Sequence, residues 1–87
     1  MDMTHHALVR SQQRGISTKL IELVLEFGAE ERAGTGVSKF FLDKAGRKAL
    51  KAYAADKVSQ CANLYVVLAD ESLVITVGHR YQRIRRH

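Results

Sequence analysis

Two apolar runs near the C-terminus constrain the fold more than any other feature of this sequence. They span Leu64 to Ala69 and Leu73 to Val77, are rich in Val, Ile, Leu and Tyr, and are separated by a short polar segment beginning at Asp70. Runs of this composition around a short polar turn are typical of a β-hairpin. Because neither run alternates cleanly between apolar and polar residues, we expect both faces of the hairpin to be covered and the pair to form the centre of a sheet.

The N-terminal third of the chain predicts two helices. The first runs from Thr4 to Arg14, with Thr4 as its N-cap and Gly15 as a left-handed stop. The second begins after the N-cap residue Ser17 and ends at about Phe27. Its apolar residues leave only a narrow polar strip, so we expect this helix to belong to the core.

Two more strands and a third helix are expected in the middle of the chain. A short charged strand from Ala29 to Ala33 suits a sheet edge, and a second strand from Val37 to Leu42 follows a glycine-containing turn. Asp43 can cap a helix from Lys44 to Ser59, whose alanine-rich face should pack on the sheet. The sequence therefore predicts an α+β fold, in which two N-terminal helices pack on a twisted antiparallel sheet of about four strands. The third helix is inserted before the last β-hairpin.

Size and composition narrow the class of protein. A chain of 87 residues has room for one domain, which we expect to span residues 1–87. No apolar run approaches the roughly 18 residues that a membrane span needs, and the N-terminus does not resemble a signal peptide. We therefore expect a cytoplasmic protein without a membrane partner. The single cysteine, Cys61, reads as a small buried residue, and no metal or cofactor is expected because ligand spacing for zinc is missing.

Positive charge indicates the kind of partner. The formal net charge of +5 favours a polyanion, RNA or DNA, although an acidic protein is also compatible. Part of this charge falls on the third helix at the i, i+3, i+4, i+7 spacing of one helix side, either as a solvated face or as a nucleic-acid footprint. The candidate nucleic-acid-binding residues are Arg14, Lys44, Arg47, Lys48, Lys51, Arg83, Arg85 and Arg86, of which the last three also read as a terminal tail.

Histidine and arginine occur near both ends of the chain. A histidine titrates near neutrality and can act as a general acid or base, while an arginine can hold a phosphate and stabilise charge that develops on it. Metal-independent RNA cleavage needs these groups, provided that the two ends of the chain meet in one cleft. The catalytic candidates are His6, Arg10, His79, Arg80 and Tyr81. Each has a structural alternative, such as a strand-capping role for His79 or a packing role for Tyr81.

Three segments together resemble a known family. The sequence HALVRSQQRGIS at residues 6–17, the sequence KFFLDKAGRKALKAY at residues 39–53 and the sequence VITVGHRYQRIRR at residues 74–86 are similar to segments of the small bacterial domains of the DUF4258 family. The resemblance implies the fold of RelE/ParE toxins and of barnase-like and colicin-type RNases. By position, His6, Arg10 and Arg14 match the helix motif of the family, and His79 and Arg80 match its strand motif. The third helix departs from the compact toxin plan.

These observations lead to one hypothesis and two alternatives. We expect an RNA-binding, toxin-like domain, and in its more specific form a metal-independent endoribonuclease of the RelE type. Its partners would be RNA, including ribosome-associated mRNA, and an acidic antitoxin-like protein. One alternative is a non-catalytic module that binds nucleic acid or an acidic partner through its basic helix and C-terminal arginines. The other is a degenerate toxin relative that acts as a regulator. The oligomeric state stays open.

Overall fold

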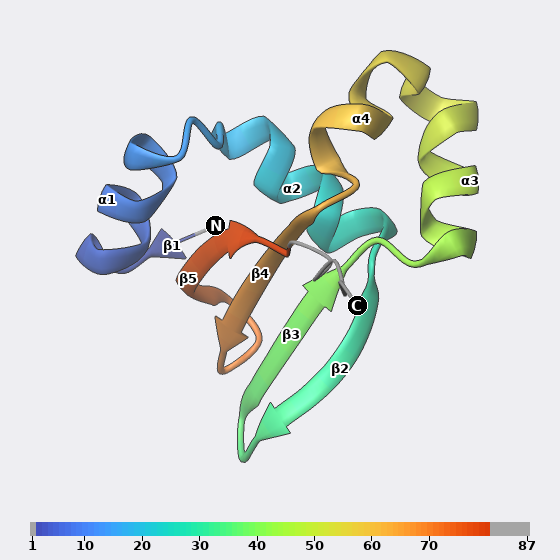
Figure 1. Ribbon diagram of the computed structural model, residues 1–87. Helices are drawn as coiled ribbons and strands as arrows, with labels where there is room; N and C mark the ends of the chain where they lie inside the picture. Colours follow the sequence, from blue (N-terminus) through green and yellow to red (C-terminus); the bar gives the residue numbers. More distant parts are fainter. Residues whose placement is uncertain (1, 81–87) are drawn as a thin grey trace, which may run out of the picture.

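A computed structural model, which describes residues 2–80, shows an α+β fold (Figure 1). The described elements are, in chain order, β1 (Asp2–Met3), α1 (His5–Gln13), α2 (Thr18–Phe27), β2 (Ala29–Gly34), β3 (Val37–Phe41), α3 (Lys44–Ala54), the 3₁₀-helix η1 (Ala55–Lys57), α4 (Val58–Cys61), β4 (Leu64–Ala69) and β5 (Leu73–His79). The α+β class is confirmed. The strand β4 has the predicted bounds, while β5 continues two residues beyond the predicted end at Val77.

The sheet differs from the prediction of about four antiparallel strands. It has five strands in the order β1-β5-β4-β3-β2, and it is mixed because β1 runs parallel to β5. The pairing of β1 continues into the next residue, where the backbone N–H of Thr4 donates to the carbonyl oxygen of Val74 at 3.0 Å. A strand of two residues is too short to show a period in the sequence, and its partner lies about 70 residues away, so only the folded chain reveals it.

The three predicted N-caps are confirmed. In each, the cap side chain accepts a hydrogen bond from the backbone N–H three residues further on: Ala7 to Thr4 at 3.0 Å, Leu20 to Ser17 at 3.3 Å and Gly46 to Asp43 at 2.7 Å. Gly15 follows α1 in the left-handed region, with φ of 65°, as expected of a stop signal.

The third helix is shorter than predicted and packs elsewhere. Ala54 leaves the helical conformation, with φ −153° and ψ 80°, and the chain continues as η1 and then α4. The helix α3 packs on α2 instead of the sheet, and of its alanine-rich face only Leu50 is fully buried. The glycine in its first turn explains this position, because a Cβ on Gly46 would lie 2.5 Å from the carbonyl oxygen of Phe27 at the end of α2. A residue that weakens the helix locally thus lets the two helices meet.

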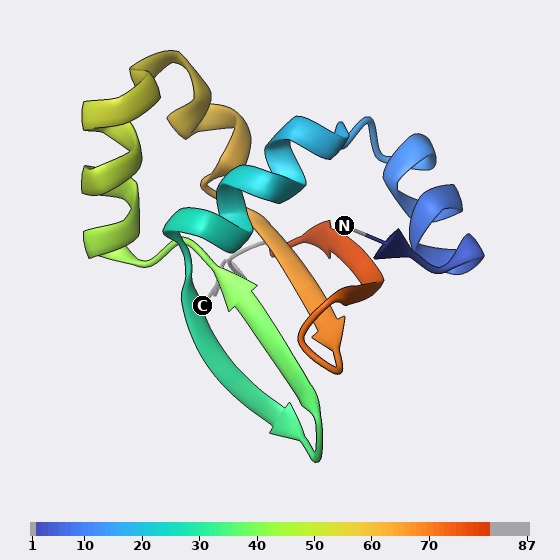
Figure 2. The same ribbon diagram turned by 180° about the vertical axis from the view of Figure 1, so that it is seen from behind.

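The described helices cover only one face of the sheet. Along the central strand β4, Leu64, Val66 and Leu68 are buried in the core, whereas the side chains between them are partly exposed. In both views α2 crosses the same side of β3 and β4 (Figures 1 and 2). The expectation that both faces are covered is therefore wrong for the described elements. The sequence does not show this alternation of buried and exposed side chains, because the residues on the other face, which include Tyr65 and Val67, are also apolar.

No helix within residues 2–80 combines the length and the hydropathy that crossing a membrane requires.

Candidate nucleic-acid interface

The side of the sheet opposite the described helices, here called the open face, gathers aromatic and cationic side chains. Strand register assigns to it alternate residues of the three inner strands, because residues directly opposite each other share a face. These are Val37, Lys39 and Phe41 on β3, Tyr65, Val67 and Ala69 on β4, and Leu73, Thr76 and Gly78 on β5. The open face is thus an apolar surface that carries a cation and two aromatic rings.

Arg80 adds a second cation to the open face. Its backbone N–H donates to the carbonyl oxygen of Asn63, which extends the pairing of β4 and β5 past His79. Its guanidinium carbon lies 4.5 Å from the centre of the Phe41 ring. This distance is within the range of a cation–π contact, so the side chain of Arg80 reaches from the end of β5 towards β3.

A cation also lies above the ring of Tyr65, as Arg80 lies above that of Phe41. The ammonium nitrogen of Lys39 lies 5.2 Å from the centre of the Tyr65 ring. The ring itself rests on β5, since a Cβ on Gly78 would lie 2.8 Å from the Tyr65 hydroxyl and 2.9 Å from two ring carbons. Gly78 therefore leaves the space in which the ring lies against the sheet. Because Phe41 and Tyr65 are direct register partners, the open face presents two neighbouring rings, each with a cation above it.

The cations of the open face have no carboxylate partner among residues 2–80. The one ion pair within 4.0 Å in this part of the chain joins Lys57 and Asp56 in η1, which is not part of the open face. Glu31 is the register partner of Lys39 on β2, yet the Lys39 ammonium is not paired with it. The positive charge on this face therefore remains available to an anion from outside.

A second cationic surface lies on α3, as its spacing predicted. Lys44, Arg47, Lys48 and Lys51 are all exposed and are here called the α3 stripe. Arg47 donates from Nη1 to the carbonyl oxygen of Leu42 at 3.5 Å, which ties the stripe to the end of β3. Within the described range, none of the four cations forms an ion pair with a carboxylate. The stripe can therefore bind a polyanion without first breaking internal ion pairs.

The described geometry does not gather the predicted catalytic residues in one cluster. His6 is exposed on the first turn of α1, and the hydroxyl of Thr4 donates to the carbonyl oxygen of Ile75 at 3.5 Å, which fixes that turn beside the first half of β5. His79 ends the strand four residues later, about 13 Å further along it. It pairs in register with the buried Leu64, so it belongs to the helix-covered side, whereas Arg80 lies on the open face.

The remaining candidates divide between described and undescribed parts of the chain. Arg10 is half-buried in α1 and Arg14 is exposed at its end. Neither lies within 4.0 Å of a carboxylate in the described structure. The positions outside the described residues are Tyr81, Arg83, Arg85 and Arg86.

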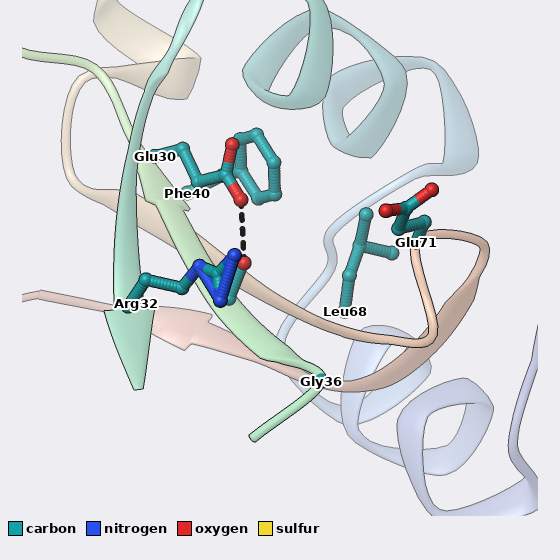
Figure 3. Close-up of a pocket in the computed structure, with 7 residues that line it drawn as sticks. Glu30, Arg32, Gly36, Phe40, Leu68 and Glu71 are labelled. Carbon is teal, nitrogen blue, oxygen red and sulfur yellow. Dashed lines mark hydrogen bonds between the residues drawn. The ribbon is translucent and has the colours of Figure 1, made fainter. Parts of the chain in front are cut away.

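A pocket lies on the helix-covered side of the sheet, near the tips of the two hairpins (Figure 3). It has a volume of about 260 Å³ and is lined by Glu30, Arg32, Gly36, Ser38, Phe40, Leu68 and Glu71. The Ser38 hydroxyl donates to the Glu30 carboxylate at 2.5 Å. Two carboxylates against one guanidinium make this pocket unsuitable for a phosphate, so it is separate from the cationic surfaces.

Neither thiol nor metal chemistry is supported by the described residues. Cys61 is buried, and burial raises the pKa of its thiol although nearby Lys57 acts in the opposite direction. A protonated, covered thiol is a poor nucleophile. Within residues 2–80, His, Cys, Asp and Glu nowhere form a group of three suited to holding a metal ion.

The residues that sequence reasoning missed are Lys39, Phe41 and Tyr65. The alternation of Val37, Lys39 and Phe41 along one strand was visible, but the sequence does not state which face of the sheet the helices cover. The fold and the site together define a small α+β domain with one aromatic and cationic sheet face. No family model matches the chain, and no curated protein or solved structure matches it significantly.

Proposed function

We propose that this protein is an RNA-binding, toxin-like domain built on a RelE-like plan. The observation that carries the proposal is that two groups of described cations, Lys39 with Arg80 on the open face and the four cations of the α3 stripe, have no carboxylate partner among residues 2–80. When such cations pair with phosphates, the counterions condensed on the nucleic acid are released, and this release drives association. The aromatic rings on the open face favour RNA over an acidic protein, because bases stack on aromatic side chains.

Charge reversal within the α3 stripe tests this function. The double variant K48E/K51E should weaken binding of a short fluorescent RNA by more than about tenfold at moderate salt, because it replaces attraction for phosphates by repulsion. The matched control is K19E/R32E, which changes the net charge equally at exposed positions outside both cationic surfaces. Equal losses in both variants, or wild-type binding no tighter than that of an unrelated protein of the same charge, would overturn the proposal.

Cleavage of the bound RNA is the narrower form of the same proposal. In that reaction the ribose 2′-oxygen attacks phosphorus after losing its proton to a base, the 5′-oxygen leaves with a proton from an acid, and a 2′,3′-cyclic phosphate results. His79 is the candidate base. Because Arg80 lies on the other side of the strand, the geometry supports binding more directly than cleavage.

The test of cleavage is incubation of RNA with purified protein in a chelator. If 2′,3′-cyclic ends form, His79→Ala should slow their appearance by about 10²–10⁴-fold while the circular dichroism spectrum stays unchanged. A rate equal to the wild-type rate would exclude His79 as the base. RNA that stays intact with the wild-type protein would reduce the proposal to binding alone.

The exposed α3 stripe also favours a second function, a non-catalytic module that binds an acidic protein such as an antitoxin-like partner. In this case K48E/K51E should abolish capture of a purified acidic, helix-rich candidate. The variants His6→Ala and His79→Ala should leave that capture unchanged. RNA that competes with the acidic partner for the same surface would place both ligands on α3.

A further inference from the structure

The open face has an arrangement suited to a particular form of nucleic acid. Resting on the proposed RNA binding, we propose that it binds single-stranded RNA by stacking two successive bases on Phe41 and Tyr65. In the same step Arg80 and Lys39 leave the ring faces and pair with the phosphates of the strand. In the free protein the two cations therefore cover the rings, and in the complex the bases take their place.

The position of the rings supports stacking of two bases. Phe41 and Tyr65 are direct register partners on adjacent antiparallel strands, so their Cβ atoms are about 5 Å apart. Tyr65 lies against the backbone at Gly78, which leaves its outer ring face towards the Lys39 ammonium. Two rings on neighbouring strands form a platform for consecutive nucleotides, and the alternation of the strands adds Val37 and Val67 as an apolar surround.

The magnitudes favour the exchange of cation for base. A cation–π contact at an exposed site changes an equilibrium constant by only about 2- to 5-fold. Stacking of a base on an aromatic side chain contributes about 5- to 150-fold per base. Arg80 is exposed, and both cations have flexible stems, so each can turn from its ring towards the backbone of the strand. The bound state therefore replaces two cation–ring contacts by two cation–phosphate contacts and adds the stacking of the bases.

This geometry selects single strands over duplexes. In a duplex the faces of the bases are stacked on one another, so a flat aromatic platform can contact only the backbone. A single strand can present two free base faces to Phe41 and Tyr65 while its phosphates pair with Arg80 and Lys39. Glu31 on the outer strand β2 is the nearest carboxylate by register. Because it repels phosphates, it would direct the bound RNA towards the β4 and β5 side of the open face.

A second copy of the chain is the competing occupant of this apolar face. Such a dimer would bury the Lys39 ammonium and the Arg80 guanidinium, and the inner strands of the open face of the second copy offer no carboxylate to pair with them. Burying like charges without counter-charges is costly, so the charge pattern favours an anionic ligand.

The experiment measures binding of a fluorescent oligouridine RNA at several salt concentrations. Phe41→Leu and Tyr65→Leu should each weaken binding by about 5- to 150-fold without changing the slope of log K against log salt concentration. Arg80→Met and Lys39→Met should instead reduce that slope by about 0.7 each, because each removes one phosphate contact. Tyr53→Leu, at an exposed aromatic residue on α3, is the matched control and should bind like the wild type.

Further measurements distinguish a loss of stacking from a disturbed fold, and single-stranded RNA from other nucleic acids. Tyr65→Phe keeps the ring and should retain wild-type affinity, which would show that the ring and not the hydroxyl is needed. An unchanged circular dichroism spectrum of Tyr65→Leu would show that its loss of affinity does not come from a disturbed fold. Duplex RNA should bind more weakly than oligouridine, and its binding should be insensitive to the leucine variants. Oligodeoxyuridine, which differs from oligouridine only in the sugar, should keep the sensitivity to both leucine variants, because stacking uses the base.

The outcomes also distinguish this inference from the function on which it rests. If wild-type protein binds RNA but both leucine variants bind as tightly, the stacking site is refuted and RNA binding stands. If wild-type protein does not bind RNA, the proposed function fails. A concentration-dependent dimer in sedimentation that Phe41→Leu dissociates would also refute the stacking site, since a second copy would cover the open face.

Discussion

Leu50 attaches α3 to the rest of the protein, and its truncation should be costly. Leu50 has an exposed fraction of 0% and is the only large side chain of α3 that is fully buried. Leu50→Ala removes three carbons at about 0.8 kcal/mol each, and incomplete collapse of the cavity adds to this. Buried Leu→Ala substitutions usually lower the free energy of unfolding by about 2–5 kcal/mol. Because α3 lies at the periphery and can shift towards α2 to fill part of the cavity, we expect a loss in the lower part of this range, about 3 kcal/mol.

Such a loss is large for a protein of this size. Domains have a free energy of unfolding of roughly 0.05–0.15 kcal/mol per residue, so Leu50→Ala should remove a substantial share of the total. The melting temperature should fall by about 12–24 °C, at roughly 4–8 °C per kcal/mol for a small domain. Urea unfolding followed by far-ultraviolet circular dichroism measures the free energy directly.

The neighbouring Tyr53 provides the matched control. Tyr53→Ala removes more atoms than Leu50→Ala, but Tyr53 is 63% exposed, and its ring lies 5.4 Å from that of Phe27 between ring centres. We expect it to cost about 1 kcal/mol. A cost of less than 1 kcal/mol for Leu50→Ala, or an equal cost for the two variants, would refute the conclusion that α3 is held mainly through Leu50.

Three further predictions concern strain, pH and close packing. Glu71 has φ of 64°, a conformation that costs an L-residue about 1–2 kcal/mol, so Glu71→Gly should stabilise the protein by about 0.5 kcal/mol after glycine's greater unfolded freedom is subtracted. Urea unfolding that shows a lower stability would contradict this. Burial raises the pKa of Cys61, so the unfolded thiol ionises first and the wild type should lose stability relative to Cys61→Ala as pH rises above about 8.5. A difference between the two proteins that is independent of pH would show that the thiol is not desolvated. Gly78→Ala should cost about 1–3 kcal/mol because its Cβ would displace the Tyr65 ring, and the same change in a Tyr65→Ala background should be neutral. An equal cost in both backgrounds would rule out the ring as the cause.

Local features of the fold were predictable from the sequence. The caps Thr4, Ser17 and Asp43 and the stop at Gly15 depend on interactions within a few residues, and such interactions leave a signature in the order of residue types. The bounds of β4 were predictable because they coincide with an apolar run that ends at a polar turn. The α3 stripe belongs to the same class, because helical spacing alone puts its cations on one side.

Features that join distant segments required the tertiary structure. Asp2–Met3 forms a strand only because β5 offers a parallel edge, and α3 leaves the sheet because Gly46 lets it meet the end of α2. The open face emerges in the same way, since Phe41, Tyr65 and Arg80 come together from three separate segments. Capping hydrogen bonds and helical period depend on residues that are close together in the chain, so the sequence shows them directly. Which faces meet and which stay open depends instead on packing among segments far apart in the chain, and no local pattern encodes that choice.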